Sequence, residues 1–171
     1  TEYRDQIDWS KAHVFWGDER CVPPNDAGSN FHQANEIFLS KVAIPENNIH
    51  RVLGELDPAT ASTKYAETLK SFVDSNLDFP RFDLVYLGMG EDGHTASLFP
   101  RSEALHETEK WVVANYVEKL SATRLTLTFP VLNNARRVLF LVAGESKASI
   151  VNEILRDDLP TKRYPAQMIS S

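Results

Sequence analysis

The hydrophobic positions of this chain fall into short runs, separated by polar segments that are rich in turn-forming residues. Runs of this length and composition are typical of strands that are buried on both faces. Five of them predict strands: residues 12–16 (AHVFW), 82–87 (FDLVYL), 111–117 (WVVANYV), 125–129 (LTLTF) and 138–143 (VLFLVA). Residues 48–53 form a weaker sixth candidate.

Between these runs, apolar residues recur at the spacing of a helix that buries one side. Ser29 or Asn30 is a good cap for a first helix, whose apolar positions are Phe31, Ala34, Phe38 and Val42. Asp57 followed by Pro58 is typical of a second helix start. The buried side of that helix would be formed by Tyr65, Leu69, Phe72 and Val73. A third helix is predicted over residues 145–155.

Strands that alternate with helices predict an α/β protein, and near-continuous apolar strands favour a parallel sheet. We therefore predict a doubly wound, Rossmann-like fold with a mainly parallel sheet and helices on both faces. The expected organisation is a single domain over residues 1–171. In such folds ligands bind beyond the carboxyl ends of the strands, so the loops that follow the strands carry the candidate chemistry.

Composition and charge narrow the possible functions. With 171 residues, 42% of them apolar and 25% charged, the chain has the values of one soluble globular domain. A net charge of −6 argues against non-specific nucleic-acid binding, so an anionic ligand would need a local basic pocket. No apolar stretch approaches the roughly 18 residues of a membrane span. Cys21 is the only cysteine, which fits a reducing compartment, and we expect a cytoplasmic protein.

The segment after residues 82–87 combines glycines with an acid and a histidine. Gly90 and Gly93 would lie at the carboxyl end of a strand, where glycines let an anion approach backbone N–H groups. His94 would then lie beside the bound molecule as a group that moves a proton near neutral pH, and Asp92 would orient it. The alternative is that the glycines only form a turn and that His94 caps the next helix.

A second loop follows residues 12–16 and begins with Asp18, Glu19 and Arg20. By the same rule this loop would face the same cleft, where the guanidinium of Arg20 matches phosphate or carboxylate oxygens. The alternative is a surface cluster of ion pairs, since most charged side chains are simply solvated.

Three further cations lie near predicted strand ends. Lys147 follows Gly144 after residues 138–143, while Lys119 and Arg124 flank the residues LSAT (120–123), just before residues 125–129. Each of them alone is as well explained by an exposed side chain. Their convergence with the histidine and the glycines is what a site for a phosphorylated small molecule requires.

Other chemistries find less support. Ser97 does not lie in the Gly-x-Ser-x-Gly elbow of serine hydrolases, and Cys21 is better explained by packing than by reactivity. The five histidines lack paired metal-ligand spacing, so we expect neither a metal nor an organic cofactor. Residues 88–93 match Gly-x-Gly-x-x-Gly, but no acidic residue ends a second strand about 20 positions later, as the dinucleotide fold requires.

Five stretches of the chain together resemble the 6-phosphogluconolactonase family. They are FWGDERCVPPNDAGSNF, NNIHRV, FDLVYLGMGEDGHTASLFP, KLSATRLTLTFPVLNNARRVLFLVAGESKA and YPAQMI, in the order of that family. The resemblance implies a doubly wound α/β core and hydrolysis of 6-phospho-D-glucono-1,5-lactone, a phosphorylated sugar lactone, in the oxidative pentose phosphate pathway.

The resemblance also implies roles for individual residues. It makes His94 the catalytic histidine and Asp92 its support. It places Arg20 and Lys147 on the phosphorylated sugar acid, with Lys119 and Arg124 as further substrate contacts beside the Gly90 and Gly93 turn. The alternatives are the deaminase and isomerase chemistry of related glucosamine-6-phosphate enzymes, or a catalytically inactive sugar-phosphate-binding module.

Two departures from that family concern the ends of the chain. Relatives carry a glycine- and serine-rich turn before the strand that contains WGDER, and they continue past YPAQ. The domain is therefore expected to be incomplete at both ends. The sequence leaves open whether the protein is a monomer or a homodimer.

Overall fold

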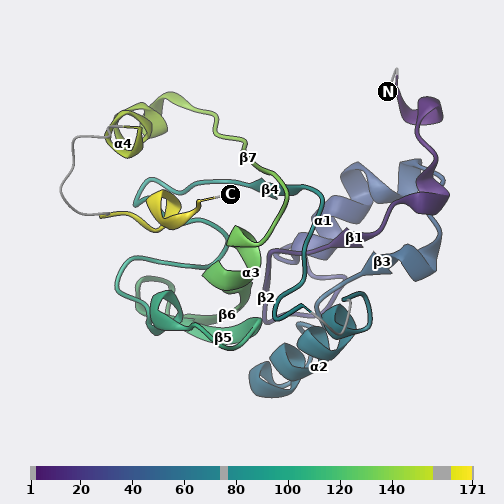
Figure 1. Ribbon diagram of the computed structural model, residues 1–171, viewed down its shortest axis with the longest axis horizontal. Coiled ribbons are helices and arrows are strands. Elements are labelled where there is room, and N and C mark those ends of the chain that lie inside the picture. Colours follow the sequence, from purple (N-terminus) through teal and green to yellow (C-terminus); the bar gives the residue numbers. More distant parts are fainter. Residues whose placement is uncertain (1–2, 74–76, 156–162, 171) are drawn as a thin grey trace.

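The computed structural model describes residues 3–73, 77–155 and 163–170, and helices alternate with strands along them (Figure 1). This order confirms the predicted α/β class. The strands are β1 (Val14–Phe15), β2 (Asp18–Arg20), β3 (Ile49–His50), β4 (Val85–Leu87), β5 (Val112–Val117), β6 (Ala122–Leu127) and β7 (Val138–Phe140). The helices are α1 (Asn30–Ile37), α2 (Pro58–Lys70), α3 (Phe129–Asn133) and α4 (Ala148–Ile154), with short 3₁₀ turns between elements.

The described strands form three small sheets, and the largest of them is antiparallel. β1 pairs with β3 and β4 pairs with β7, both in parallel. β6 lies between β2 and β5 and runs antiparallel to both. The prediction of a mainly parallel sheet is therefore wrong for β2, β5 and β6.

The connection between β5 and β6 explains this difference. Only residues 118–121 join the two strands, whereas a parallel crossover takes a dozen residues or more. Ser121 has φ 47° and ψ 39°, a left-handed conformation that helps the chain to reverse. Residues 18–20, predicted as part of a loop, are extended because they pair with residues 124–126 of β6.

Both predicted helix starts are confirmed. The Ser29 side chain accepts a hydrogen bond from the backbone N–H of His32 (3.1 Å), and Asp57 accepts one from Thr60 (3.1 Å). These caps satisfy N–H groups that have no partner within the helix. In the described part of the chain, no helix has the length and apolarity needed to cross a membrane.

The main cluster of buried apolar side chains combines residues of α2, α3 and the antiparallel sheet. α2 packs against β5 and β6, and its Tyr65 and Leu69 are buried as predicted. The Tyr65 hydroxyl bonds both the N–H (2.8 Å) and the carbonyl (3.0 Å) of Trp16, which ties α2 to the end of β1. Phe72, expected on the same buried side, lies beyond the end of α2 and is 48% exposed.

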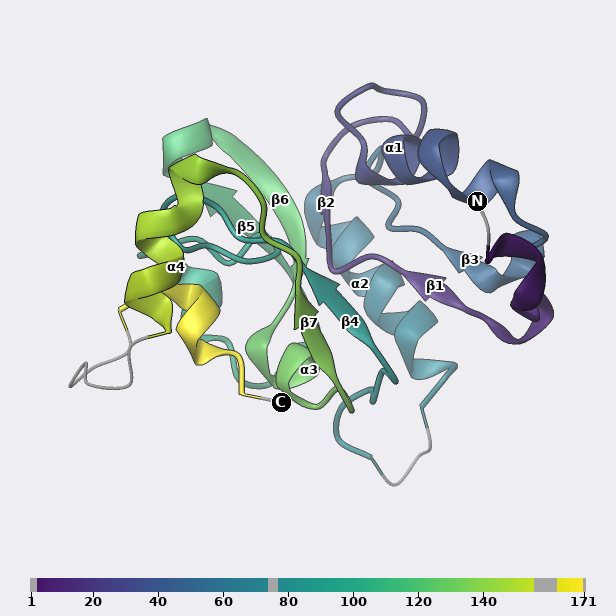
Figure 2. The same ribbon diagram turned by 90° about the horizontal axis from the view of Figure 1, so that it is seen from above.

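One face of the β4–β7 pair carries exposed apolar side chains. Figure 2 shows β4 and β7 side by side, with α4 following β7. Tyr86 and Leu139 are opposite each other in register, and Leu141 lies two residues further on, on the same side. Their exposed fractions are 62%, 47% and 61%, so none of the described residues covers this face.

Candidate active site

The glycine-rich segment after β4 folds into a tight turn that holds His94 in place. The N–H of Gly90 donates to the carbonyl of His94 (2.9 Å), and the N–H of Gly93 donates to the carbonyl of Gly90 (3.0 Å). A side chain at position 90 would fall on the imidazole of His94. Position 93 has φ +73°, and a Cβ there would lie 2.7 Å from the Cβ of Tyr164. Both positions therefore require glycine.

Asp92 joins His94 to Lys119. Its Oδ1 lies 2.5 Å from Nδ1 of His94, and its Oδ2 accepts a hydrogen bond from Nζ of Lys119 (3.0 Å). Burial raises the pKa of Asp92, but the hydrogen bonds from His94 and Lys119 together outweigh burial and lower this pKa to about 2. Asp92 is therefore ionised near neutral pH.

The ionised Asp92 fixes the hydrogen on the imidazole. A carboxylate only accepts hydrogen bonds, so Nδ1 of His94 donates to it, and in the neutral imidazole the lone pair is then on Nε2. The ring of Phe99 stacks on the imidazole, with ring centres 4.0 Å apart, and limits its rotation. The His94 side chain is still 27% exposed. Neutral His94 therefore presents one acceptor nitrogen to an incoming molecule.

The side chains of Arg20 and Arg124 leave the antiparallel sheet on the same face. They are opposite each other on β2 and β6, and opposite residues share a face. Asn115, opposite Arg124 on β5, donates to the carbonyl of Ser97 (2.8 Å), so this face is turned toward the segment that follows His94. Arg20 also donates through Nη1 to the carbonyl of Gly28.

Lys147 lies at the end of a 3₁₀ turn that leads into α4. Because β4 and β7 are parallel neighbours, the turn with His94 and the turn with Lys147 leave the same end of this pair. Among the described residues, no hydrogen bond or ion pair joins Lys147 to the other predicted site residues. Among the predicted site residues that the structure describes, side-chain contacts thus connect Asp92, His94 and Lys119, and backbone hydrogen bonds add Gly90 and Gly93.

Asp18 and Glu19 are not a surface ion-pair cluster, which was the alternative for this segment. Glu19 is 1% exposed and accepts hydrogen bonds from the N–H groups of Asn30 (2.7 Å) and Phe31 (2.8 Å), at the start of α1. Asp18 accepts a hydrogen bond from the hydroxyl of Ser97 (2.6 Å). Burial raises the pKa of Asp18, and the bond from Ser97 opposes this rise.

Three residues that shape the site were not predicted: Ser97, Phe99 and Tyr164. Nothing in the local sequence separates their packing roles from those of other core residues. Asn115, a fourth residue that was not predicted, differs from these three. An amide inside the otherwise apolar run 111–117 indicates a side chain that bonds a buried polar group, and Asn115 is indeed buried. In the structure that group is the carbonyl of Ser97, which the sequence alone does not identify.

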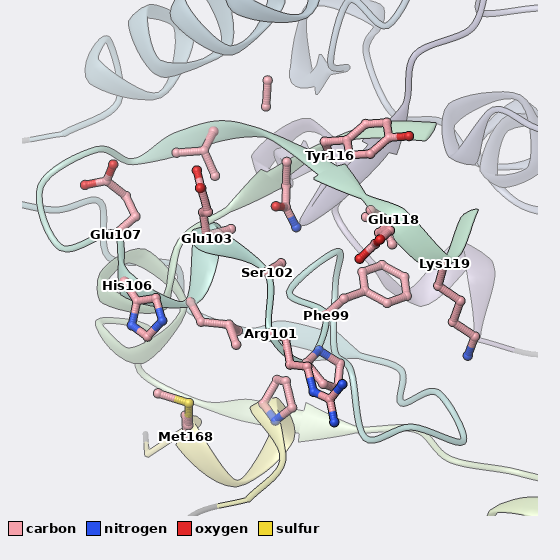
Figure 3. A pocket seen from close by; sticks show the side chains of 18 of the residues that line it. Phe99, Arg101, Ser102, Glu103, His106, Glu107, Tyr116, Glu118, Lys119 and Met168 are labelled. Atoms are coloured by element: carbon pink, nitrogen blue, oxygen red, sulfur yellow. The ribbon is translucent and has the colours of Figure 1, made fainter. Parts of the chain in front are cut away.

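A cleft of about 1460 Å³ lies beside this site (Figure 3). β5 and the segment after Phe99 line it. Figure 3 shows Phe99 and Lys119 toward one end of the cleft and His106 toward the other. Asp92 also contributes to the lining, whereas His94 does not. The cleft therefore adjoins the site at Asp92, Phe99 and Lys119 without containing its histidine.

The described residues offer little support for a metal site or a reactive thiol. Within the described ranges, no three His, Cys, Asp or Glu side chains are grouped to hold a metal ion. The Cys21 thiol is partly buried, and burial raises its pKa, which disfavours a reactive thiolate.

Similarity to known proteins places the chain in a family. The model of glucosamine-6-phosphate isomerases/6-phosphogluconolactonase matches residues 1–171. The chain belongs to this family. The chloroplastic 6-phosphogluconolactonase 3 of Arabidopsis thaliana is 43% identical over 164 residues, which are 91% of this chain and 50% of that protein. The 6-phosphogluconolactonase of Haemophilus influenzae is 37% identical over 171 residues, which are 100% of this chain and 72% of that protein.

A solved structure agrees with this membership. The crystal structure of 6-phosphogluconolactonase from Thermotoga maritima matches with a TM-score of 0.82 at 35% identity, over 98% of this chain and 72% of that one. The resemblance inferred from the sequence motifs is therefore confirmed. The chain spans half the length of the Arabidopsis relative. The activity of the whole protein is accordingly a proposal.

Proposed function

We propose that the protein hydrolyses 6-phospho-D-glucono-1,5-lactone to 6-phosphogluconate, as a carboxylic-ester hydrolase of the oxidative pentose phosphate pathway. The observation that carries this proposal is the 2.5 Å contact between Asp92 and Nδ1 of His94, because it leaves Nε2 as a base. Membership of the family supports the same reaction, since several relatives bear the name 6-phosphogluconolactonase.

The proposed mechanism uses His94 twice. Nε2 takes a proton from a water molecule while the water oxygen attacks the lactone carbonyl carbon C1. The tetrahedral intermediate then collapses, the bond from C1 to the ring oxygen breaks, and the protonated imidazole returns its proton to that oxygen. Ionised Asp92 stabilises the imidazolium that forms between the two steps.

The negative charge on the C1 oxygen needs a donor or a cation. The N–H groups of Gly90 and Gly93 already donate within the turn, so we assign this task to Lys119, which contacts Asp92. Arg20, with Arg124 and Lys147, would bind the phosphate. That group is remote from the breaking bond, so these cations mainly position the substrate.

His94→Asn tests this mechanism in the full-length protein. We expect kcat for lactone hydrolysis to fall about 10² to 10⁴-fold, the usual contribution of a positioned acid–base group, once spontaneous hydrolysis is subtracted. His106→Asn is the matched control, because His106 lies in the adjoining cleft without contacting Asp92. Its activity should match that of the unmodified protein.

Full activity of His94→Asn would refute the mechanism. A loss in His106→Asn as large as that in His94→Asn would assign the reaction to the cleft instead. Ammonia release from glucosamine 6-phosphate, without lactone hydrolysis, would favour the isomerase branch of the family. If both activities were absent, the remaining hypothesis would be a catalytically inactive sugar-phosphate-binding protein.

The finer details of fold and location belong to the same proposal. We propose that the two parallel pairs, β1–β3 and β4–β7, are parts of one doubly wound, Rossmann-like sheet with helices on both faces, within a single domain. Both pairs are parallel, and Figures 1 and 2 show them as neighbours, which supports this arrangement. A location in the cytoplasm fits the single cysteine, which is free, and we propose a monomer or homodimer there.

A further inference from the structure

Ser97 lies three residues after His94, and each of its polar atoms makes a hydrogen bond. Its hydroxyl donates to Oδ2 of Asp18 (2.6 Å) and its N–H donates to Oγ1 of Thr126 (3.2 Å). Its carbonyl accepts a hydrogen bond from Nδ2 of Asn115 (2.8 Å). Ser97 is 2% exposed, and Asn115 and Thr126 are 4% and 1% exposed. Removing any one partner would leave a buried polar group unsatisfied.

The three partners come from three different strands and share one face of the antiparallel sheet. Asp18 on β2 is opposite Thr126 on β6. Val113 on β5 is also opposite Thr126, and Asn115 lies two residues further, hence on the same face. Arg20 and Arg124 lie on that face too, each two residues from a partner of Ser97. The bonds of Ser97 therefore fix the histidine segment relative to both arginines.

The backbone between His94 and Ser97 is held in an unfavourable conformation. Ala96 has φ +47°, which a residue with a side chain adopts only where its surroundings enforce it. Thr95 donates to the carbonyl of Gly88 (2.9 Å), and the N–H of Leu98 donates to the carbonyl of Thr95 (2.9 Å). Without the bonds of Ser97, Ala96 could relax and rotate the segment that carries His94.

We propose that Ser97, together with Asp18, Thr126 and Asn115, is a positioning anchor for the catalytic histidine. This inference rests on the proposed lactone hydrolysis. The anchor acts through His94 and does not react itself: the Ser97 hydroxyl is buried and donates to Asp18, so it is not available as a nucleophile.

Ser97→Ala in the full-length protein tests the anchor. Displacing a catalytic group by about 1 Å costs roughly 10²-fold in rate, so we expect kcat to fall by about that factor while KM changes less than about twofold. Ser102→Ala is the matched control, because the Ser102 hydroxyl is buried beside the cleft and has no partner among the described residues. Its kcat should be unchanged.

A second comparison separates positioning from a merely structural role. In the His94→Asn background, Ser97→Ala should cause no further loss of kcat, since the group it positions is already gone. Equal losses in both backgrounds, or an unchanged kcat in Ser97→Ala, would overturn the proposal. Should Ser97→Ala fail to fold, Thr126→Val and Thr126→Ser decide: the valine variant should lose kcat and the serine variant, which keeps the hydroxyl, should recover it.

The anchor is also testable without substrate. The proton on Nδ1 of His94 gives an NMR signal at low field when it is held in a short bond to Asp92. That signal should broaden or vanish in Ser97→Ala and persist in Ser102→Ala. A persistent signal in both would overturn the anchor. Because no lactone is needed, this result stands apart from a failure of the proposed activity itself.

Discussion

At the scale of single residues, Asp92 gives the site a negative charge near neutral pH. Two positive or proton-donating groups, His94 and Lys119, bond its two oxygens, and together they outweigh the cost of burial. The resulting pKa of about 2 lies below the usual value of about 3.9. Ionised Asp92 therefore stabilises the folded protein above about pH 4, and this stabilisation is lost as the pH falls toward 2.

Asp92→Asn should reveal this pH dependence. Asparagine resembles the protonated acid, so the variant should be less stable than the unmodified protein above about pH 4, and the gap should close as the pH falls toward 2. Urea unfolding at several pH values measures the gap. Asp83→Asn is the control, since Asp83 is 94% exposed and its bridge to Arg136 is expected to contribute little. A gap that stays constant from pH 5 to 2 would contradict the assignment.

At the scale of elements, features that depend on neighbouring residues, such as helix caps, were predicted correctly. Pairings between strands far apart in the sequence were not. The caps at Ser29 and Asp57 were found because a cap and its helix are neighbours in sequence. The extended conformation of residues 18–20 was missed because it depends on β6, about a hundred residues away. Turn formers around that segment dominated its local pattern.

The residues of the candidate site show the same difference between nearby and distant parts of the sequence. His94, Asp92 and the two glycines were predicted because they share one short motif, and the structure joins Lys119 to them. The anchor of Ser97 was not predicted, because its partners lie 79, 29 and 18 residues away in sequence. Only the pairing of three strands brings Asp18, Thr126 and Asn115 together.

Glu19 shows how one side chain stabilises two elements. It lies in β2, and its carboxylate accepts hydrogen bonds from Ser29, Asn30 and Phe31 at the start of α1. Glu19→Gln replaces one acceptor oxygen with a donor, and we expect a loss of about 2 kcal/mol in the free energy of unfolding. For a chain of this size that corresponds to a fall of roughly 4–8 °C in Tm by circular dichroism.

Glu36→Gln on α1 is the control for this prediction. Glu36 is 67% exposed and lies 3.7 Å from His32, a contact that stabilises a helix only weakly. Its Tm should stay within about 2 °C of that of the unmodified protein. An equally small change in Glu19→Gln would show that the carboxylate does not hold α1 to β2.

At the scale of the whole molecule, the face of the β4–β7 pair is the feature from which we predict the behaviour of the 171-residue chain in solution. Tyr86, Leu139 and Leu141 are all at least 47% exposed on one side of a parallel pair, an arrangement that is normally covered. Such a face favours binding of apolar dyes and self-association.

We expect the 171-residue chain to enhance the fluorescence of the dye ANS, and the triple variant Tyr86→Ser, Leu139→Ser, Leu141→Ser to reduce this signal strongly. Ile37→Ser on α1 is the control, because Ile37 is 73% exposed but distant in sequence from the β4–β7 face. It should reduce the signal much less. Equal dye binding by the chain and its triple variant would contradict the assignment of this face.

The three bonds that hold Ser97 have a consequence for how a ligand is received. They hold the segment that carries the imidazole, so the position of the histidine is fixed before a ligand binds. Any adjustment to the shape of a ligand must then come from long side chains with several rotatable bonds, such as Lys119, whose side chain is 68% exposed. In the proposed mechanism, proton transfer therefore belongs to a side chain that the fold holds in place, and substrate binding to longer side chains that can change rotamer.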